Sequence, residues 1–174
     1  MKHFLIVVDM QNDFVSGSLG SKEAVGIINN SCERIKSFDG EIFVTYDTHA
    51  EDYMSSAEGK KLPVLHCVKG TNGWELDPMI AESLAGRDYT SVEKPTFGSV
   101  ELPDMISKAA CGDDFDITVI GLCTDICVVS NALLLKAYFP EKRIIVDAAC
   151  CAGVTPESHT AALLTMKMCH IEVE

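Results

Sequence analysis

The chain has 174 residues, a length that fits one domain, and 47% of them are hydrophobic, which is enough for a full core. Its formal net charge of −12 argues against nucleic acid and anionic membranes as partners, because both attract basic patches. No apolar stretch is long enough to cross a membrane, and Phe4–Val8 is too short for a signal peptide, so we expect a cytoplasmic protein.

Short β-branched runs alternate with helix-like stretches along the chain. The runs predict buried parallel strands, with the third weaker and the sixth a candidate only: Phe4–Val8, Ile42–Tyr46, Thr90–Glu93, Ile117–Gly121, Arg143–Asp147 and Ile171–Val173. Helices are predicted over Ala24–Phe38, Leu102–Ala110, Asp125–Phe139 and Pro156–Met168, the last capped by Thr155. This alternation predicts one α/β domain over residues 1–174, with a doubly wound, mainly parallel sheet and helices on both faces in three layers.

Ionisable residues stand at the ends of several predicted strands. Asp9, Asp47 and Lys94 each follow such a run directly, and Cys127 lies at the junction between the strand Ile117–Gly121 and the helix after it. Ligands bind outside the carboxyl ends of the strands in an open parallel sheet. We therefore predict that these four residues, far apart in sequence, converge on one pocket.

Cys127 is the residue at which the sequence predicts a reaction to begin. Helix N-terminal amides and the charge of Lys94 would favour its thiolate form. Asp9 could accept the thiol proton and return it to a leaving amine, and the backbone amides of Cys123 and Cys127 could form an oxyanion hole. A single cysteine in an apolar run is often only a core residue, so the prediction rests on the joint placement of these groups.

The chain contains eight cysteines, which we expect to be reduced thiols because no secretion signal accompanies them. Most would serve as small buried apolar residues. Cys123 and Cys127 are four residues apart, a spacing that does not fit a CxxC redox or zinc-knuckle motif. A non-catalytic redox or metal-binding module remains an alternative of a different class.

The long predicted loop Thr48–Asn72 carries residues of the metal-ligand type. Asp47 and His49 are two residues apart at its start, so both could reach one ion, and His66 and Glu58 would supply further donors. Mixed nitrogen and oxygen ligation suits Zn²⁺, Fe²⁺ or Mn²⁺. An Asp-x-His pair also occurs in loops without a metal, and Glu58 alone could be a surface residue.

Three segments, Asp9–Phe14, Glu93–Ser99 and Gly121–Val128, resemble the isochorismatase-like cysteine hydrolases. The resemblance is collinear and covers nearly the whole chain. Asp47–His49 and His66–Thr71 resemble the nicotinamidase branch in particular.

The resemblance implies the doubly wound α/β fold of that family and a cis peptide bond before Cys123. It implies a catalytic triad of Asp9, Lys94 and Cys127. It also implies one divalent ion, with Zn²⁺ favoured over Fe or Mn. The ligands carried over by the resemblance, with Glu58 matching the version that uses a glutamate, are Asp47, His49, Glu58 and His66.

By the same resemblance, the reaction would convert nicotinamide to nicotinic acid and ammonia through a Cys127 thioester, as in NAD salvage. The substrate contacts that it implies are Phe14, Leu62, Leu122 and Cys123. A second pocket aromatic is expected just before the metal histidine, where this chain has Leu62–Leu65. That departure keeps another small amide open as the substrate, whereas isochorismate hydrolysis requires neither Cys127 nor a metal. Members of the family are often homo-oligomers, which we expect here too.

Overall fold

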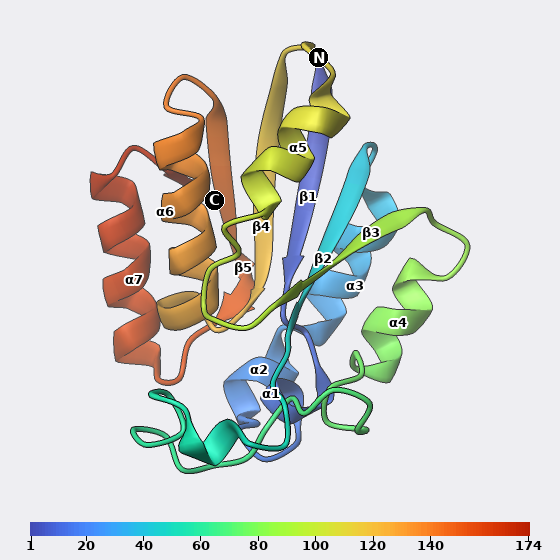
Figure 1. Cartoon of the computed structure of the whole chain (residues 1–174). Coiled ribbons are helices and arrows are strands. Elements are labelled where there is room, and N and C mark those ends of the chain that lie inside the picture. Colours follow the sequence, from blue (N-terminus) through green and yellow to red (C-terminus); the bar gives the residue numbers. More distant parts are fainter.

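The computed structural model describes all 174 residues and is built around one parallel sheet of six strands (Figure 1). The strand order is β3-β2-β1-β4-β5-β6, so the direction of winding reverses between β1 and β4. The strands are β1 (Lys2–Val8), β2 (Glu41–Asp47), β3 (Tyr89–Lys94), β4 (Phe115–Leu122), β5 (Arg143–Ala152) and β6 (Glu172–Val173). A reversal of this kind is where open α/β sheets bind their ligands.

Helices cover both faces of the sheet, as expected. Buried side chains of α2, α3 and α4 lie in one core cluster, and those of α5, α6 and α7 lie in the other. None of these helices is long and apolar enough to span a membrane. The helices are α1 (Asn12–Val15), α2 (Lys22–Gly26), α3 (Ile28–Ser37), α4 (Pro78–Leu84), α5 (Leu102–Ala110), α6 (Val129–Tyr138) and α7 (Pro156–Met168).

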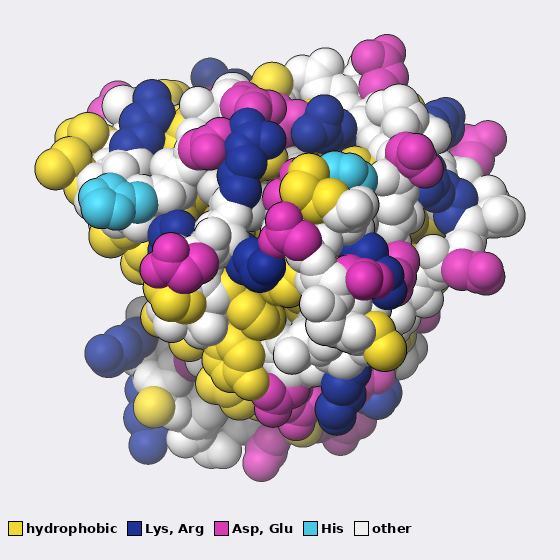
Figure 2. Space-filling view, turned by 90° about the horizontal axis from the view of Figure 1, so that it is seen from above, with side chains coloured by type: hydrophobic (Ala, Val, Ile, Leu, Met, Phe, Trp, Pro, Cys, Tyr) yellow, Lys and Arg dark blue, Asp and Glu magenta, His cyan; other side chains and the backbone are white.

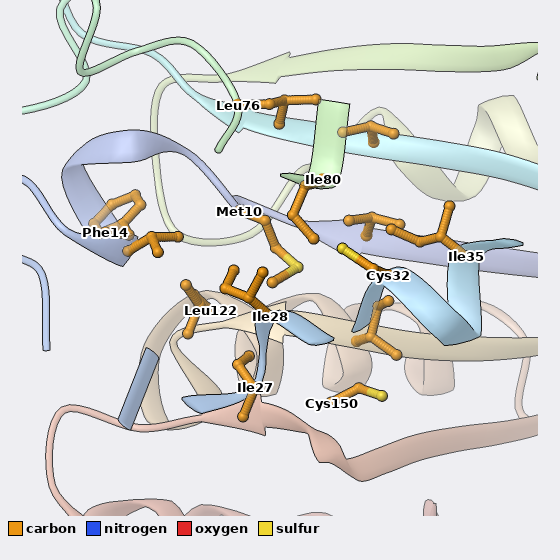
Figure 3. Close-up of a cluster of buried hydrophobic side chains, with 14 of the residues drawn as sticks. Met10, Phe14, Ile27, Ile28, Cys32, Ile35, Leu76, Ile80, Leu122 and Cys150 are labelled. Carbon is orange, nitrogen blue, oxygen red and sulfur yellow. The ribbon is translucent and has the colours of Figure 1, made fainter. Parts of the chain in front are cut away.

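The central strand β1 explains why its sequence is apolar at every position from Phe4 to Val8. Leu5 and Val7 point into the cluster with α3, whereas Phe4, Ile6 and Val8 point into the cluster with α6. Side chains alternate between the faces of a strand, so a strand covered on both sides must be hydrophobic throughout. Figure 3 shows the first cluster, in which α3 side chains lie against Met10 and Leu122.

Five of the predicted strands lie within the observed ones, and the sixth shares Glu172–Val173 with β6. The helices predicted over Leu102–Ala110 and Pro156–Met168 have those bounds in the structure. The prediction of a single helix over Ala24–Phe38 is wrong, because α2 ends at Gly26 and α3 begins at Ile28.

Four further elements differ from the sequence prediction. The helix predicted from Asp125 begins as a π-helical turn, Thr124–Val128, which leads into α6. β5 continues beyond Asp147 to Ala152, with a bulge in its pairing to β4 between Val119 and Gly121. α1 and α4 were not predicted. α4 does carry sequence signals, since the Asp77 carboxylate accepts hydrogen bonds from the first turn and Pro78 begins the helix.

Candidate active site

The four strand-end residues converge at the carboxyl edge of the sheet, as the sequence predicts. Asp9 follows β1, Asp47 ends β2 and Lys94 ends β3, where the strand register sets it directly beside Asp47. Cys127 lies in the π-helical turn that follows β4. In Figure 1 this edge lies at the bottom, beside α1, α2 and the loop after β2.

Lys94 is the centre of the cluster. Its Nζ lies 2.5 Å from Asp9 Oδ2, 3.5 Å from Cys127 Sγ and 3.5 Å from Asp47 Oδ1. The ammonium group also donates a hydrogen bond to the backbone oxygen of Thr96 at 3.1 Å. The side chains of Lys94 and Asp9 are 1% and 0% exposed, so this ion pair is shielded from water.

The cluster changes the acidity of its members in different directions. Burial alone would lower the pKa of Lys94, but the negative charge of Asp9, with Cys127 and Asp47, holds that pKa above its ordinary value. Burial raises the pKa of Asp9, opposed by Lys94. The lysine therefore stays charged and serves as the fixed positive group of the site.

Asp9 is oriented by its backbone and by β2. It has a positive φ of 46°, and its Oδ1 accepts a 2.6 Å hydrogen bond from the Thr45 hydroxyl. The neighbouring Gly121 has φ of 119° and no room for a side chain, since a Cβ there would lie 2.1 Å from the Val8 oxygen. β1 and β4 can therefore approach closely just before the turn that carries Cys127.

Cys127 is 4% exposed and lines the pocket. Burial raises its pKa well above the ordinary value, and the negative charge of Asp9 raises it further, while Lys94 opposes both. Cys127 is the fourth residue of its turn, so burial there works against the thiolate form that the sequence favours, and Lys94 works for it. The cis peptide bond expected before Cys123 is present between Leu122 and Cys123.

Asp47, His49 and His66 form a compact group of metal-ligand type. Their donor atoms all lie within 4.8 Å of one another, and all three residues are buried. The Asp47 Oδ2 atom lies 3.1 Å from His49 Nε2 and 3.5 Å from His66 Nε2. Burial opposes ionisation of Asp47, but hydrogen bonds from the two histidines hold its pKa below the ordinary value.

Other residues fix the orientation of these ligands. His66 Nδ1 donates to the Val64 backbone oxygen at 2.8 Å, which leaves His66 Nε2 directed at Asp47. The Gln11 side chain holds the backbone of Asp47: its Oε1 accepts the Asp47 N–H at 2.8 Å, and its Nε2 donates to the Asp47 backbone oxygen at 2.9 Å. Tyr53 packs on His49 with ring centroids 4.5 Å apart. A carboxylate and two oriented imidazoles fit a divalent ion such as Zn²⁺.

Glu58 lies at the edge of this group. Its Oε1 is 3.8 Å from His66 Nε2 and 3.9 Å from His49 Nε2. Burial and the charge of Asp47 raise its pKa above the ordinary value. Its side chain is 20% exposed, against 7% for His49 and 2% for His66, so Glu58 is more accessible to solvent than either histidine.

Cys127, Asp47 and His66 line a cavity of about 270 Å³. Of the predicted substrate contacts, Phe14, Leu62 and Cys123 line it. The prediction for Leu122 is wrong, because its side chain is fully buried in the first core cluster beside Ile28 (Figure 3). The remaining lining residues are Leu19, Gly20, Ser21, Glu58, Phe97, Ile126, Gly153 and Val154.

Phe97 is the aromatic residue of the cavity lining that the sequence did not predict. It supplies a second aromatic wall from the segment after β3 rather than from the segment before His66. The signal was present in the Glu93–Ser99 motif, where Phe97 follows Lys94 by three residues. Its place in the pocket depends on how that segment folds back over the sheet.

Residues 3–173 match the family model of the isochorismatase domain. The chain belongs to the isochorismatase family. A nicotinamidase of Schizosaccharomyces pombe is 29% identical, with 97% of this chain and 91% of that relative covered. A Bacillus subtilis nicotinamidase structure matches with 25% identity, TM-score 0.83 and 99% of each chain covered. A Pyrococcus horikoshii pyrazinamidase, solved in complex with zinc, matches with 26% identity, TM-score 0.83 and coverage of 100% and 99%.

These relatives share the isochorismatase-like α/β fold and place the chain in the nicotinamidase branch of the family.

Proposed function

We propose that this protein is a metal-dependent amide hydrolase that converts nicotinamide to nicotinic acid and ammonia. One observation carries the proposal. Lys94 contacts both Asp9 and Cys127, and Cys127 lines a cavity that two members of the metal-ligand group, Asp47 and His66, also line. Acyl transfer requires a nucleophile, a proton acceptor close to it and an electrophilic group facing the same space.

In this proposal Asp9 takes the proton of the Cys127 thiol while Lys94 balances the negative charge. The Cys127 sulfur attacks the amide carbon, and the backbone amides of Cys123 and Cys127 stabilise the oxyanion. Asp9 then returns the proton to the leaving ammonia, which produces a thioester that water hydrolyses. The raised pKa of Cys127 supports a thiol that is deprotonated only as it attacks.

We propose that Asp47, His49 and His66 hold the divalent ion, with Glu58 placed to contribute. A bound ion would act as a Lewis acid toward the substrate and would lend positive charge to this end of the cavity. The ion is proposed as Zn²⁺, because a buried set of two imidazoles and one carboxylate suits zinc. Fe²⁺ and Mn²⁺ are the alternatives.

The dimensions and lining of the cavity support a small, flat, uncharged substrate. About 270 Å³ is at the lower end of ligand pockets, which are commonly about 300–1,000 Å³. The lining offers two aromatic side chains, Phe14 and Phe97, together with Leu62 and Val154. Nicotinic acid as the product would place the enzyme in NAD salvage.

The test is ammonia release from nicotinamide by the metal-loaded protein, with Cys127→Ala as the blank. We expect steady release from the wild type and a loss of at least about 10⁴-fold in the variant, because removing a nucleophile stops covalent catalysis. Retained turnover in Cys127→Ala would contradict the assignment of the nucleophile.

A different small amide is the second candidate substrate, favoured by the absence of an aromatic residue in Leu62–Leu65. Metal binding without ammonia from nicotinamide, but with ammonia from another carboxamide, would select this candidate. Metal binding with no release from any amide would instead select a non-catalytic metal-binding module.

A further inference from the structure

Asn131 is a fully buried polar side chain on α6, one turn of helix beyond Cys127. Asparagine is among the weaker helix-forming residues, so the helix itself gives no reason for it. A buried amide group is tolerated only when it is hydrogen-bonded. The partners of Asn131 therefore indicate what the residue does.

The side-chain amide of Asn131 makes three hydrogen bonds to backbone groups of two separate segments. Its Nδ2 donates to the Cys127 oxygen at 2.8 Å and to the Phe97 oxygen at 3.2 Å. Its Oδ1 accepts the N–H of Ser99 at 2.9 Å. One planar group thus joins the turn that carries Cys127 to the segment that follows Lys94.

That segment carries two parts of the site. It begins at Lys94, whose ammonium group is also held by the Thr96 oxygen at 3.1 Å, and it supplies the Phe97 wall of the cavity. β3 and β4 are not neighbours in the sheet, because β2 and β1 lie between them. Strand pairing therefore does not directly set the 3.5 Å between Lys94 Nζ and Cys127 Sγ.

We propose that Asn131 is a positioning residue that fixes the position of Cys127 relative to Lys94 and Phe97. The role rests on the function proposed above and adds a residue to it that touches no substrate. An asparagine fits because it offers two donors and an acceptor on one short rigid group. An aspartate would only accept, and a threonine could bond the Cys127 oxygen four residues back but could not serve both segments.

The test compares Asn131→Ala and Asn131→Thr with a control of equal stability. The control is Ile106→Val or Ile106→Ala, whichever matches the Tm of the Asn131 variant, since Ile106 is buried in α5 away from the cavity. The first readout is kcat at saturating nicotinamide. The second is hydrogen exchange of the Ser99 amide, followed by NMR, which needs no substrate.

We expect kcat to fall roughly 10- to 100-fold in both Asn131 variants relative to the control, because small misplacements of reacting groups have effects of that order. We also expect the Ser99 amide to exchange about tenfold faster in Asn131→Ala, since its only acceptor is removed. If Asn131→Ala does not fold, kcat and the exchange of the Ser99 amide are measured on Asn131→Thr instead.

Three outcomes decide between the explanations. A kcat equal to that of the stability-matched control would overturn the positioning role and leave Asn131 as a structural residue. Unchanged exchange of the Ser99 amide would overturn the link between the segments. No ammonia release by the wild type would overturn the proposed function alone, because the exchange measurement still decides whether Asn131 holds the segment.

Discussion

A Lys–Asp ion pair lies at each end of the parallel strands, buried at the carboxyl ends (the carboxyl edge) and exposed to solvent at the amino ends (the amino edge). At the carboxyl edge, Lys94 lies 2.5 Å from Asp9, with side chains 1% and 0% exposed. At the amino edge, Lys142 lies 2.6 Å from Asp114, with side chains 29% and 71% exposed. Figure 2 shows that edge, where charges of both signs are mixed over the surface. Geometry alone therefore does not distinguish a site from a surface contact.

The pKa values show what burial adds. The pKa of Asp114 is held below its ordinary value by the hydrogen bond from Lys142. The pKa of Asp9 is raised by burial even though Lys94 is closer. A carboxyl group whose pKa is raised can take up and release a proton during a reaction, whereas Asp114 is simply a solvated anion. The same substitution made at the carboxyl edge and at the amino edge tests this difference between a buried and an exposed group.

The largest effect is expected from removing the proton acceptor. Asp9→Asn should lower kcat/KM by about 10²–10⁴-fold, the usual contribution of a general acid or base. Asp114→Asn removes the matching carboxylate at the amino edge and should leave kcat/KM unchanged. Steady-state ammonia release measures both variants. A loss of less than tenfold in Asp9→Asn would mean that another group moves the proton.

Metal binding should follow the same division between the edges. His66 lies 3.5 Å from Asp47, and His3 at the amino edge lies 2.8 Å from Asp116. His66→Ala should lose its divalent ion and most of its activity, since a buried ligand is removed. His3→Ala should retain one ion per chain. Elemental analysis after dialysis measures the metal content of both variants. Stoichiometric metal in His66→Ala would place the metal site elsewhere.

Stability provides the next contrast. Lys94→Met should cost about 3 kcal/mol in the free energy of unfolding, because it leaves Asp9 buried without its partner. Lys142→Met should cost much less, because water already screens that pair. Urea unfolding of the two variants measures the difference. Equal losses would show that the buried pair contributes no more than the exposed one.

The smallest effect concerns pH at the amino edge. Because the folded-state pKa of Asp114 is depressed, its contribution to stability is present above its unfolded value of 3.8 and is lost as pH falls through the folded value. Asp114→Asn should therefore lower Tm slightly at neutral pH, and the gap from the wild type should close in acid. Thermal scans from pH 2 to 7 test this. A gap that widens in acid would contradict the sign.

Much of the site could be predicted because its residues stand at strand ends. Asp9, Asp47 and Lys94 follow or end runs whose β-branched composition identifies them as buried strands, and parallel strands end at a common edge. α7 was predicted with its bounds because Thr155 and Pro156 specify where it starts. These are local signals with direct structural consequences.

What could not be predicted depends on contacts between distant segments. The burial that raises the pKa of Cys127 comes from the folded pocket, whereas the sequence showed only a strand-to-helix junction. Phe97 lines the cavity, and Asn131 bonds its backbone oxygen, because the segment after Lys94 folds back onto α6. Leu122 is part of a recognisable motif, yet the pleat of β4 turns its side chain into the core.

The central claim is that the Cys127 sulfur carries the acyl group of the substrate. The most direct measurement mixes the metal-loaded protein with nicotinamide, stops the reaction in acid at successive times, and analyses the Cys127 peptide by mass spectrometry. The account predicts a nicotinoyl thioester on Cys127 that appears before steady ammonia release and is absent from Cys127→Ala. A nicotinoyl group on another residue, or steady turnover in Cys127→Ala, would contradict it.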